Sequence, residues 1–493
     1  MRTTSLRCNR NKQNGIALLI LIIAIALTIS TYYFSKISIV EIKADNQQKT
    51  RIALAKAKKL LLGYAVSRAD LATPVVLSTQ LGRYGYLPCP AINNGEGNSV
   101  GNCGSKNENT FGWFPWRSLG SPPLKDGNGD CLLYVTSGSY KQSPSSDMLN
   151  EDTNGMFQIV DEAGVTNQGV AAPERVVAIV FSPGNTLTGQ NRNFEDGSIC
   201  GNDETNYDTE YLDAYEVSPG VFIDNSGVVT GNADEIYQFV QASITSNSDI
   251  FNDQFITITR EELWKDILAR SDFEVKMTNL TEALAVCLNK YATENGYNRL
   301  PWPAPMSLTD YREDDNYDDN EDSVAGYAGR FPYIVKSSNT DINYVIDDEL
   351  FLAANCDNLI LPTGGITAHL LDSSPGSNDE YKNLWKNWKD HFFYVVSQDY
   401  SPASSNAACA GNCIKVNGAT NVRAATVIFS GSRIGQIRTG PVGSDINTKD
   451  LISNYIENGN EAKFPDLSGN EEYVVGGNDI MFCIEDGLGV VPC

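Results

Sequence analysis

The sequence predicts an α+β protein, in which a long N-terminal membrane-spanning helix precedes two tandem modules, each a helix plus an antiparallel β-sheet with long loops. Three observations predict this architecture. An uncharged apolar stretch follows a basic N-terminus, apolar residues continue beyond it at helical spacing, and six sequence blocks recur in the same order later in the chain. With 493 residues, the chain is long enough for two or more domains.

The first element is the N-terminal apolar segment. Residues 1–15 contain four basic residues and no acidic one, and residues 13–35 carry no charge. About 20 apolar residues cross a bilayer as a helix, so the segment predicts a single membrane span. The aromatic residues at its end suit a membrane interface better than a signal-peptidase site. The simplest alternative is a plain single-pass anchor with an uncleaved leader.

The second element is a helical continuation of that segment. Between Lys36 and Ala69 there is no proline, and the only glycine is Gly63. Ala53, Ala57, Leu60 and Tyr64 recur at helical spacing, with lysines between them. We therefore expect a transmembrane and amphipathic helix over residues 16–69.

The remaining elements form a tandem repeat, expected as a first module over residues 70–270 and a second over 275–493. The strongest block aligns Arg175–Ser182 with Arg423–Ser430, and both contain apolar runs of strand length. Further blocks align Leu87–Pro90 with Leu300–Pro303, Gly112–Trp116 with Gly329–Tyr333, and Asp130–Val135 with Asp390–Val395. Ordered repetition of this kind predicts two copies of one module.

The basic leader that ends at Gly15, followed by Ile16, Ala17, Leu18 and Leu19, resembles type IV prepilins and type II secretion pseudopilins. The resemblance implies that a prepilin peptidase cleaves between Gly15 and Ile16 and that Ile16 is then methylated. It also implies that Ile16–Phe34 packs among other pilin helices, and that the modules are pilin-like. Loss of the four basic residues would change the net charge from −24 to −28.

One position departs from this resemblance. Most major pilins have glutamate as the fifth mature residue, where this chain has Ile20. The chain is similar in this respect to tip pseudopilins and some minor pilins. Its repeated blocks also resemble large proteobacterial minor-pilin-like proteins, in segments Ala57–Ala65, Leu87–Pro90, Gly112–Gly120 and Leu133–Val135. The resemblance implies no enzymatic activity.

The cysteines predict disulfide bonds. Cys8 lies in the leader, and ten cysteines remain after it: Cys89, Cys103, Cys131, Cys200, Cys287, Cys356, Cys409, Cys413, Cys483 and Cys493. An even number in an extracytoplasmic head is typical of disulfides, and no CxxC pattern favours a structural metal instead. Short loops favour the pairs 89–103, 409–413 and 483–493, with 131–200 and 287–356 spanning longer loops, although the sequence alone leaves the connectivity open.

A single motif suggests a cation. Asp126, Asn128 and Asp130 have the D-x-N-x-D spacing of a calcium loop. The glycine and glutamate that complete an EF-hand loop are replaced by Cys131 and Gly138, so an Asp/Gly-rich turn is the alternative. No other cofactor is expected.

Composition and motifs disfavour several function classes. The net charge of −24 disfavours nucleic acid as a partner. The only two histidines, His369 and His391, have no evident partners, and neither a P-loop nor an HExxH motif occurs. Arg192 and Arg438 recur at matching positions and are expected to bind loop carbonyls rather than form a pocket. We therefore do not expect the protein to be an enzyme.

Together these observations predict a minor pilin or pseudopilin-like subunit of a type IV pilus or type II secretion filament, acting at the tip or in assembly priming. The expected location is the inner membrane, with the head in the periplasm or outside the cell on a pilus. The expected partners are other pilins or pseudopilins, the prepilin peptidase and the inner membrane. The alternative is a membrane-anchored adhesin or surface-binding protein.

Overall fold

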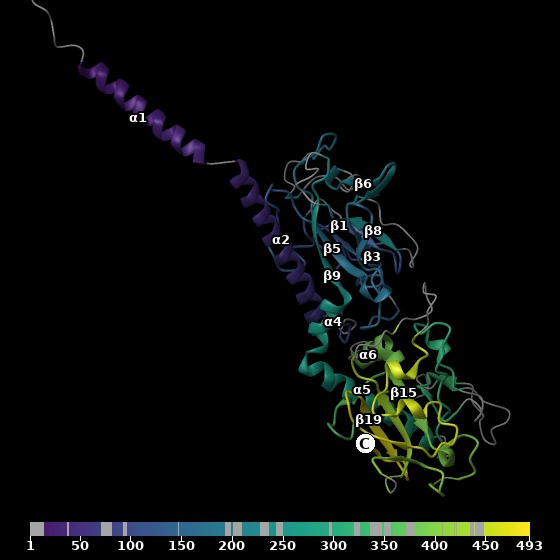
Figure 1. Ribbon diagram of the computed structural model, residues 1–493. Helices are drawn as coiled ribbons and strands as arrows, with labels where there is room; N and C mark the ends of the chain where they lie inside the picture. The colour runs from purple at the N-terminus through teal and green to yellow at the C-terminus, as the bar shows by residue number, and fades with distance from the viewer. Residues whose placement is uncertain are drawn as a thin grey trace, which may run out of the picture.

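The computed structural model describes most of the chain after the first 13 residues (Figure 1). The described residues are 14–493 except 37–38, 71–80, 92–95, 146, 193–198, 201–209, 227–235, 243–249, 295–297, 320–325, 336–347, 350–355, 371–379, 407, 419, 421, 434–437 and 439–447. Most of the expected leader, residues 1–13, therefore lies outside them.

The N-terminal region contains two helices, α1 (Asn14–Lys36) and α2 (Ile39–Ser67). Figure 1 shows α1 standing apart from the head, whereas α2 lies along the first sheet. Ala57, Leu61 and Ala65 recur every four residues on α2 and are fully buried, which is the apolar stripe that a helix presents to a core.

The expected transmembrane helix requires correction. Among the described residues, no helix combines the length and the apolar character needed to cross a bilayer. The run of Ile, Leu and Ala in α1, Ile16–Ile29, extends about 21 Å at 1.5 Å per residue, short of a hydrocarbon core of about 30 Å. The predicted membrane span and the single-pass inner-membrane location that depended on it are therefore wrong.

The first half of the head is built on a seven-stranded sheet with the order β1-β2-β5-β3-β4, to which β9 adds on β5 and β8 on β3. Its strands are β1 (Thr110–Trp113), β2 (Leu133–Thr136), β3 (Phe157–Val160), β4 (Thr166–Gln168), β5 (Val176–Ser182), β8 (Tyr237–Val240) and β9 (Gln254–Thr259). The central strand β5 is buried along its whole length, as expected of a strand covered on both faces.

The second half has a seven-stranded sheet with the order β10-β15-β17-β16-β18, to which β19 adds on β17 and β20 on β19. Its strands are β10 (Ala328–Arg330), β15 (Phe392–Val396), β16 (Ile414–Val416), β17 (Val422–Phe429), β18 (Glu472–Tyr473), β19 (Ile480–Glu485) and β20 (Val490–Pro492). The β3–β8 and β16–β18 pairs are parallel. Both large sheets are thus mixed, which corrects the expected pilin-like modules with purely antiparallel sheets.

Three two-stranded sheets complete the described strands. They are β6 (Ala214–Ser218) with β7 (Val221–Asp224), β11 (Ile334–Val335) with β12 (Asp348–Glu349), and β13 (Leu359–Ile360) with β14 (Thr367–Ala368). The repeat pattern does not predict them, because they lie in the loops between the repeated blocks.

The two large sheets share a common arrangement of six strands, to which β4 adds only in the first sheet and β20 only in the second. In each sheet, an edge strand (β1 or β10) pairs with a second strand (β2 or β15), and that second strand pairs with the central strand (β5 or β17). On the other side of the central strand, a third strand (β3 or β16) forms a short parallel pair with β8 or β18. Helix α2 packs on β5 and β9, and α5 (Ser271–Glu294) packs in the same way on β17 and β19. The boundaries at residues 70, 270 and 275 remain predictions.

The strand register shifts the strongest repeated block by one residue. The sequence blocks align Arg175 with Arg423, whereas in the sheets Val176 is the equivalent of Arg423. Val176 lies opposite Phe157 on β3, and Arg423 lies opposite Ile414 on β16. Both central strands have a register irregularity at this point, toward β9 and β19 respectively. Because side chains alternate between the faces of a sheet, this shift decides which residues share a core.

A turn after each central strand is built in the same way. Gly184 and Gly431 have φ of +65° and +62°, in the left-handed region that favours glycine. A Cβ atom on either would lie 2.3 Å from an oxygen atom, of Asn252 and Asn478 respectively. Each asparagine also donates its side-chain N–H to the residue after the glycine, at 2.7 Å and 2.6 Å. The repetition therefore extends to individual hydrogen bonds.

The halves are joined by α4 (Arg260–Leu268), α5 and α6 (Glu380–Trp388). The rings of Trp264 and Trp388 meet edge to face with centroids 5.6 Å apart. Asn387 accepts the backbone N–H of Leu149 at 3.0 Å, and its own carbonyl accepts Asn150 Nδ2 at 2.8 Å. One hydrophobic cluster consequently runs without interruption from α2 to the C-terminal strands.

Candidate functional site

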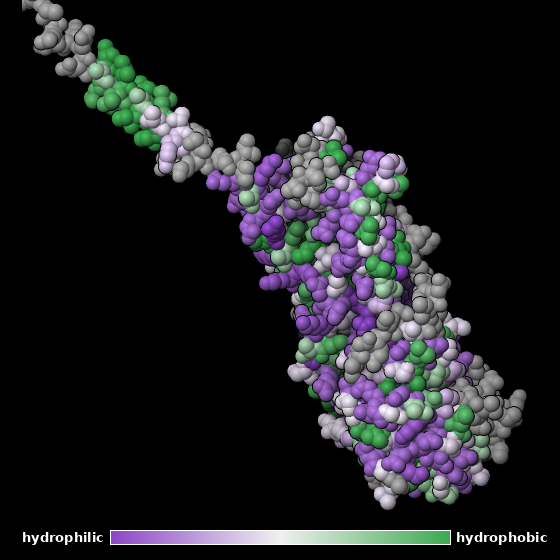
Figure 2. Space-filling model, in the orientation of Figure 1, coloured by the Kyte–Doolittle hydropathy of each residue, from purple (hydrophilic) through white to green (hydrophobic). Residues whose placement is uncertain are grey.

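The most exposed apolar surface of the described chain is α1. Ile16, Leu18, Leu19 and Ile20 are each about 60% exposed, and similar values continue to Ile29 at 52%. Figure 2 shows these side chains as an apolar column on a largely polar molecule. A helix that is apolar on all sides requires neighbours on all sides, so α1 is the first candidate for an interaction site.

Three hydroxyl side chains of α1 bond to the helix itself. The Thr28 hydroxyl donates to Ala24 O at 3.0 Å, Ser30 donates to Ala26 O at 2.7 Å, and Thr31 donates to Leu27 O at 2.9 Å. Because these three hydroxyls are satisfied within the helix, they can enter an apolar environment without becoming unpaired donors.

The other processing and packing residues have less structural description. Gly15 belongs to the first turn of α1, and Phe34 belongs to its last turn, but their side-chain environments lie outside the described part of the chain. Ile20, where major pilins have glutamate, is 60% exposed. Cleavage after Gly15 and methylation of Ile16 stay predictions.

The ten cysteines after the leader form five disulfides within the described residues. The bonds are Cys89–Cys103, Cys131–Cys200, Cys287–Cys356, Cys409–Cys413 and Cys483–Cys493. Three of them are the pairs that short loops favoured, the other two are the suggested longer-loop pairs, and each bond lies within one half of the head. Disulfides of this number are typical of an oxidising compartment.

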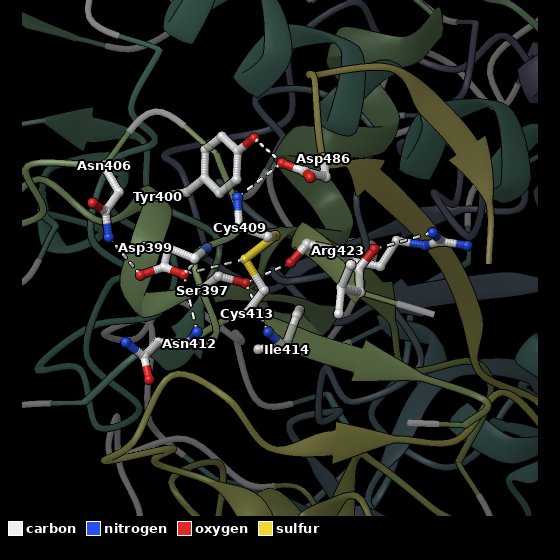
Figure 3. The surroundings of a disulfide bond; sticks show 12 residues. Ser397, Asp399, Tyr400, Asn406, Cys409, Asn412, Cys413, Ile414, Arg423 and Asp486 are labelled. Carbon is white, nitrogen blue, oxygen red and sulfur yellow. Dashed lines mark hydrogen bonds between the residues drawn. A yellow bond between two sulfur atoms is a disulfide. The ribbon is translucent and has the colours of Figure 1, made fainter. Parts of the chain in front are cut away.

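The small loop closed by Cys409–Cys413 is organised by Asp399 (Figure 3). Asp399 Oδ2 accepts the backbone N–H groups of Ala410 at 2.6 Å and Asn412 at 2.9 Å, and Oδ1 accepts Asn406 Nδ2 at 2.9 Å. Burial opposes ionisation, but these donors outweigh it and lower the pKa of Asp399. The arrangement stabilises a turn and leaves the carboxylate fully engaged.

The predicted calcium residues hold a loop against α2. Asp126 Oδ1 accepts the N–H groups of Asn128 at 2.9 Å and Asp130 at 3.0 Å, while Oδ2 accepts the Ser182 hydroxyl at 2.8 Å. Asp130 forms an ion pair of 2.7 Å with Arg192. Asn128 Oδ1 accepts an N–H from α2 at 3.3 Å. Protein donors therefore occupy these oxygens, and calcium binding stays a prediction.

The two recurring arginines bind loop carbonyls, as expected of them. Arg192 donates to Gly184 O at 2.7 Å and Pro183 O at 3.1 Å. Arg438 donates to Asn454 O at 2.6 Å, and its Nη1 also lies 3.4 Å from Glu151 Oε1 in the first half of the head. The second arginine thereby reaches across the junction between the halves.

At that junction lies a buried cluster of Glu151, Asp152 and His391. One ligand atom from each lies within 4.8 Å of the others. His391 Nε2 is 3.3 Å from Asp152 Oδ2 and 4.0 Å from Glu151 Oε1. His391 and Asp152 are 0% and 2% exposed. The cluster combines a loop of the first half with the residue before β15 of the second.

The other nitrogen of His391 has a fixed partner. Nδ1 lies 2.8 Å from Asp390 Oδ1, and the second oxygen of Asp390 is paired with Lys449. Burial opposes ionisation of Asp390, but the charges of Lys449 and His391 outweigh it and hold its pKa well below the usual range. An ionised Asp390 can only accept, so Nδ1 carries a proton and donates it. The imidazole is thereby oriented with Nε2 toward Asp152 and Glu151.

The carboxylate of Asp152 is charged but poorly satisfied. Burial opposes its ionisation, yet Arg438 and His391 outweigh burial and lower its pKa to about 2. Neither Asp152 oxygen accepts a hydrogen bond of suitable geometry from any described residue. His391 Nε2 also forms no such hydrogen bond within the described part of the chain. Burial and the adjacent charge of Asp152 raise the pKa of Glu151. The positive charges of Arg438 and His391 therefore offset the cost of burying the Asp152 carboxylate.

The sequence did not indicate this cluster, because neither Glu151–Asp152 nor His391 belongs to a metal-binding motif. One signal was present in the repeat. His391 occupies the position that Cys131 occupies in the first half, directly after an aspartate in both copies. A titratable residue in place of a disulfide-bonded one marks a local change of chemistry.

No known protein family, curated protein or solved structure matches the chain.

Proposed function

We propose that the chain is a minor-pilin or pseudopilin-like subunit of a type IV pilus or type II secretion filament, acting at the tip or in assembly priming through protein–protein contacts. The observation that supports this proposal is the exposure of α1. Its apolar side chains, from Ile16 at 65% to Ile29 at 52%, surround the helix. The proposal therefore rests on the N-terminal helix and not on the fold of the head.

A bundle of similar helices is the partner that fits α1 best. Burial of one Ile or Leu side chain contributes about 1.5–3 kcal/mol, so a helix with this composition gains most when every side is covered. A single partner surface would cover only one stripe of it. The internally bonded hydroxyls of Thr28 and Ser30 add no cost on burial. Subunits with the same kind of helix supply this environment.

The head and Ile20 favour a special position over a repeated one. A head built of two sheets beside a single helix is bulky relative to that helix (Figure 1). Repetition at every position of a filament would crowd such heads together. The absence of the glutamate that major pilins have at position 20 agrees with a tip or priming subunit.

The test is the mature N-terminus. The full chain is expressed with and without a prepilin peptidase, and its intact mass and N-terminal sequence are measured. We expect peptidase-dependent cleavage that leaves a methylated Ile16 at the N-terminus. Gly15→Leu is the matched variant, which should keep the full mass under both conditions. An uncleaved wild-type chain in the presence of an active peptidase would overturn the proposal.

Contact through α1 is tested separately in assembled filaments. A photo-crosslinking residue at Ile22, 59% exposed on α1, should attach the chain to other subunits through their N-terminal helices. The matched position is Phe222, 61% exposed on the β6–β7 hairpin of the head, which should give no such product. Equal products from both positions would contradict packing through α1.

A further inference from the structure

We propose that Glu151, Asp152 and His391 bind one divalent transition-metal ion, which ties the two halves of the head together. The inference is independent of the proposed filament function. It stands on the convergence of three ligand atoms within 4.8 Å and on their burial. It also stands on the lack of hydrogen-bond donors for both Asp152 oxygens.

The distances suit a metal ion. Two ligands that lie 2.0–2.1 Å from a tetrahedral zinc ion are separated by about 3.3–3.4 Å. His391 Nε2 and Asp152 Oδ2 are 3.3 Å apart, and Nε2 and Glu151 Oε1 are 4.0 Å apart. Glu151 Oε1 must move closer to His391 Nε2 for all three groups to reach a common ion.

The surroundings of the ligands also suit a metal ion. The bond from His391 Nδ1 to Asp390, at 2.8 Å, is the carboxylate–histidine contact that orients a ligating imidazole. Glu151 Oε1 accepts the backbone N–H of Arg433 at 2.6 Å, which fixes the second carboxylate. Asp152 N donates to Asn150 Oδ1 at 3.0 Å, which fixes its loop. Each of the three groups is thus held by a second contact.

The ligand set selects the class of ion. Calcium and magnesium prefer oxygen ligands, whereas imidazole with carboxylates suits zinc, iron or manganese. A proton on His391 Nε2 is the competing occupant. A proton on Nε2 can be donated to only one acceptor, and Asp152 Oδ2, at 3.3 Å, is nearer than Glu151 Oε1, at 4.0 Å. A metal ion would engage Glu151, Asp152 and His391 at once.

The experiment uses the full chain produced without a histidine tag. Because the ligands are buried, zinc is supplied during expression, and the purified protein is dialysed against a chelator before elemental analysis. We expect one retained zinc per chain. We expect at least a tenfold loss of retained zinc in Asp152→Asn and in His391→Gln. The matched control is His369→Gln, which removes the other histidine and should retain zinc like the wild type.

The His369→Gln variant keeps all three proposed ligands, so it tests the metal site even if Asp152→Asn and His391→Gln fail to fold. It contains a single histidine, His391. X-ray absorption of its zinc should therefore show one imidazole and oxygen ligands without sulfur. The proposal is overturned if the wild type retains no zinc, if the first shell of this variant contains no imidazole, or if a folded His391→Gln chain retains as much zinc as the wild type.

Discussion

Asp253 and Asp479 are equivalent buried residues of the two halves, each directly after an asparagine that closes a turn. Burial is the largest influence on both, and it raises the pKa of each carboxyl. At Asp479, the N–H of Glu457 opposes this effect and the charge of Glu457 adds to it, and the pKa rises to about 7. The repeat has therefore kept an acid that is neutral in the folded state at mildly acidic pH.

We expect Asp479 to make the head less stable as the pH rises, because its carboxyl group must lose a proton while it is buried. Unfolded, Asp479 titrates near its usual pKa of 3.8, and folded it titrates near 7. The folded state therefore binds more protons between these values, and the free energy of unfolding falls as pH rises from about 4 to 7. In Asp479→Asn this contribution is absent. Thermal unfolding across this pH range should show a flatter profile for the variant, and parallel profiles would contradict the assignment.

His391 shows the limit of a residue-by-residue reading. From the sequence it had no evident partner, whereas in the structure Asp390 and Asp152 lie 2.8 Å and 3.3 Å from its two nitrogens. Asp152 is more than 200 positions away in the chain, so no spacing rule connects them. Burial opposes protonation of His391, but the two carboxylates outweigh it and raise its pKa.

Among the elements, α4 begins with a capping box. Thr259 Oγ1 accepts Glu262 N at 3.2 Å, and Glu262 Oε2 accepts Thr259 N at 3.1 Å. Glu262 also forms an ion pair of 2.6 Å with Lys58 of α2. The cap therefore starts the helix that leads from the first half to the second.

Loss of this cap should destabilise the head by about 1 kcal/mol, because an N-terminal N–H of α4 loses its acceptor. The variant is Thr259→Ala, and chemical denaturation measures the change. Thr278→Ala is the control, because the Thr278 hydroxyl donates only to Glu274 O one turn back in α5. If both variants lost the same free energy of unfolding, the loss could not be attributed to the cap, and the prediction would be contradicted.

The repeated strands show how an element can be predicted while its register is not. The blocks indicated strands at β5 and β17, but they matched Arg175 with Arg423, whereas the sheets place Val176 opposite the equivalent partner. Sequence similarity alone does not reveal the register irregularities next to these residues. A one-residue slip exchanges the faces of a strand, so only the pairing decides it.

At the scale of the whole molecule, one hydrophobic cluster joins the two halves. Trp388 lies near its centre, with ring centroids 5.6 Å from Trp264, 5.3 Å from Phe273 and 6.0 Å from Phe429. These partners come from α4, α5 and β17. The halves are therefore expected to unfold together, although each has its own sheet.

Trp388→Ala should lower the free energy of unfolding by about 3–5 kcal/mol, because it leaves a cavity in this shared core. Calorimetry should show a single transition, displaced to lower temperature as a unit. Phe222→Ala is the control, since that side chain is 61% exposed on the β6–β7 hairpin. Two separate transitions in the wild type would contradict a continuous core.

The local features of this protein could be predicted from the order of its amino acids. Helical spacing indicated α2, the repeated blocks indicated strands at β5 and β17, and short loops favoured three of the five disulfide pairs, 89–103, 409–413 and 483–493. These features depend on contacts between nearby or matching residues, which leave a direct trace in the order of amino acids.

The remaining features depend on how distant segments of the chain pack together. The parallel pairs β3–β8 and β16–β18, the register of the central strands and the meeting of Asp152 with His391 all join residues that are distant in the chain. The expected membrane span was wrong because a run of apolar residues indicates burial but does not say against what. Such pairings depend on how the formed helices and strands pack against one another. This packing involves residues from the whole core, so no single segment of the sequence predicts it.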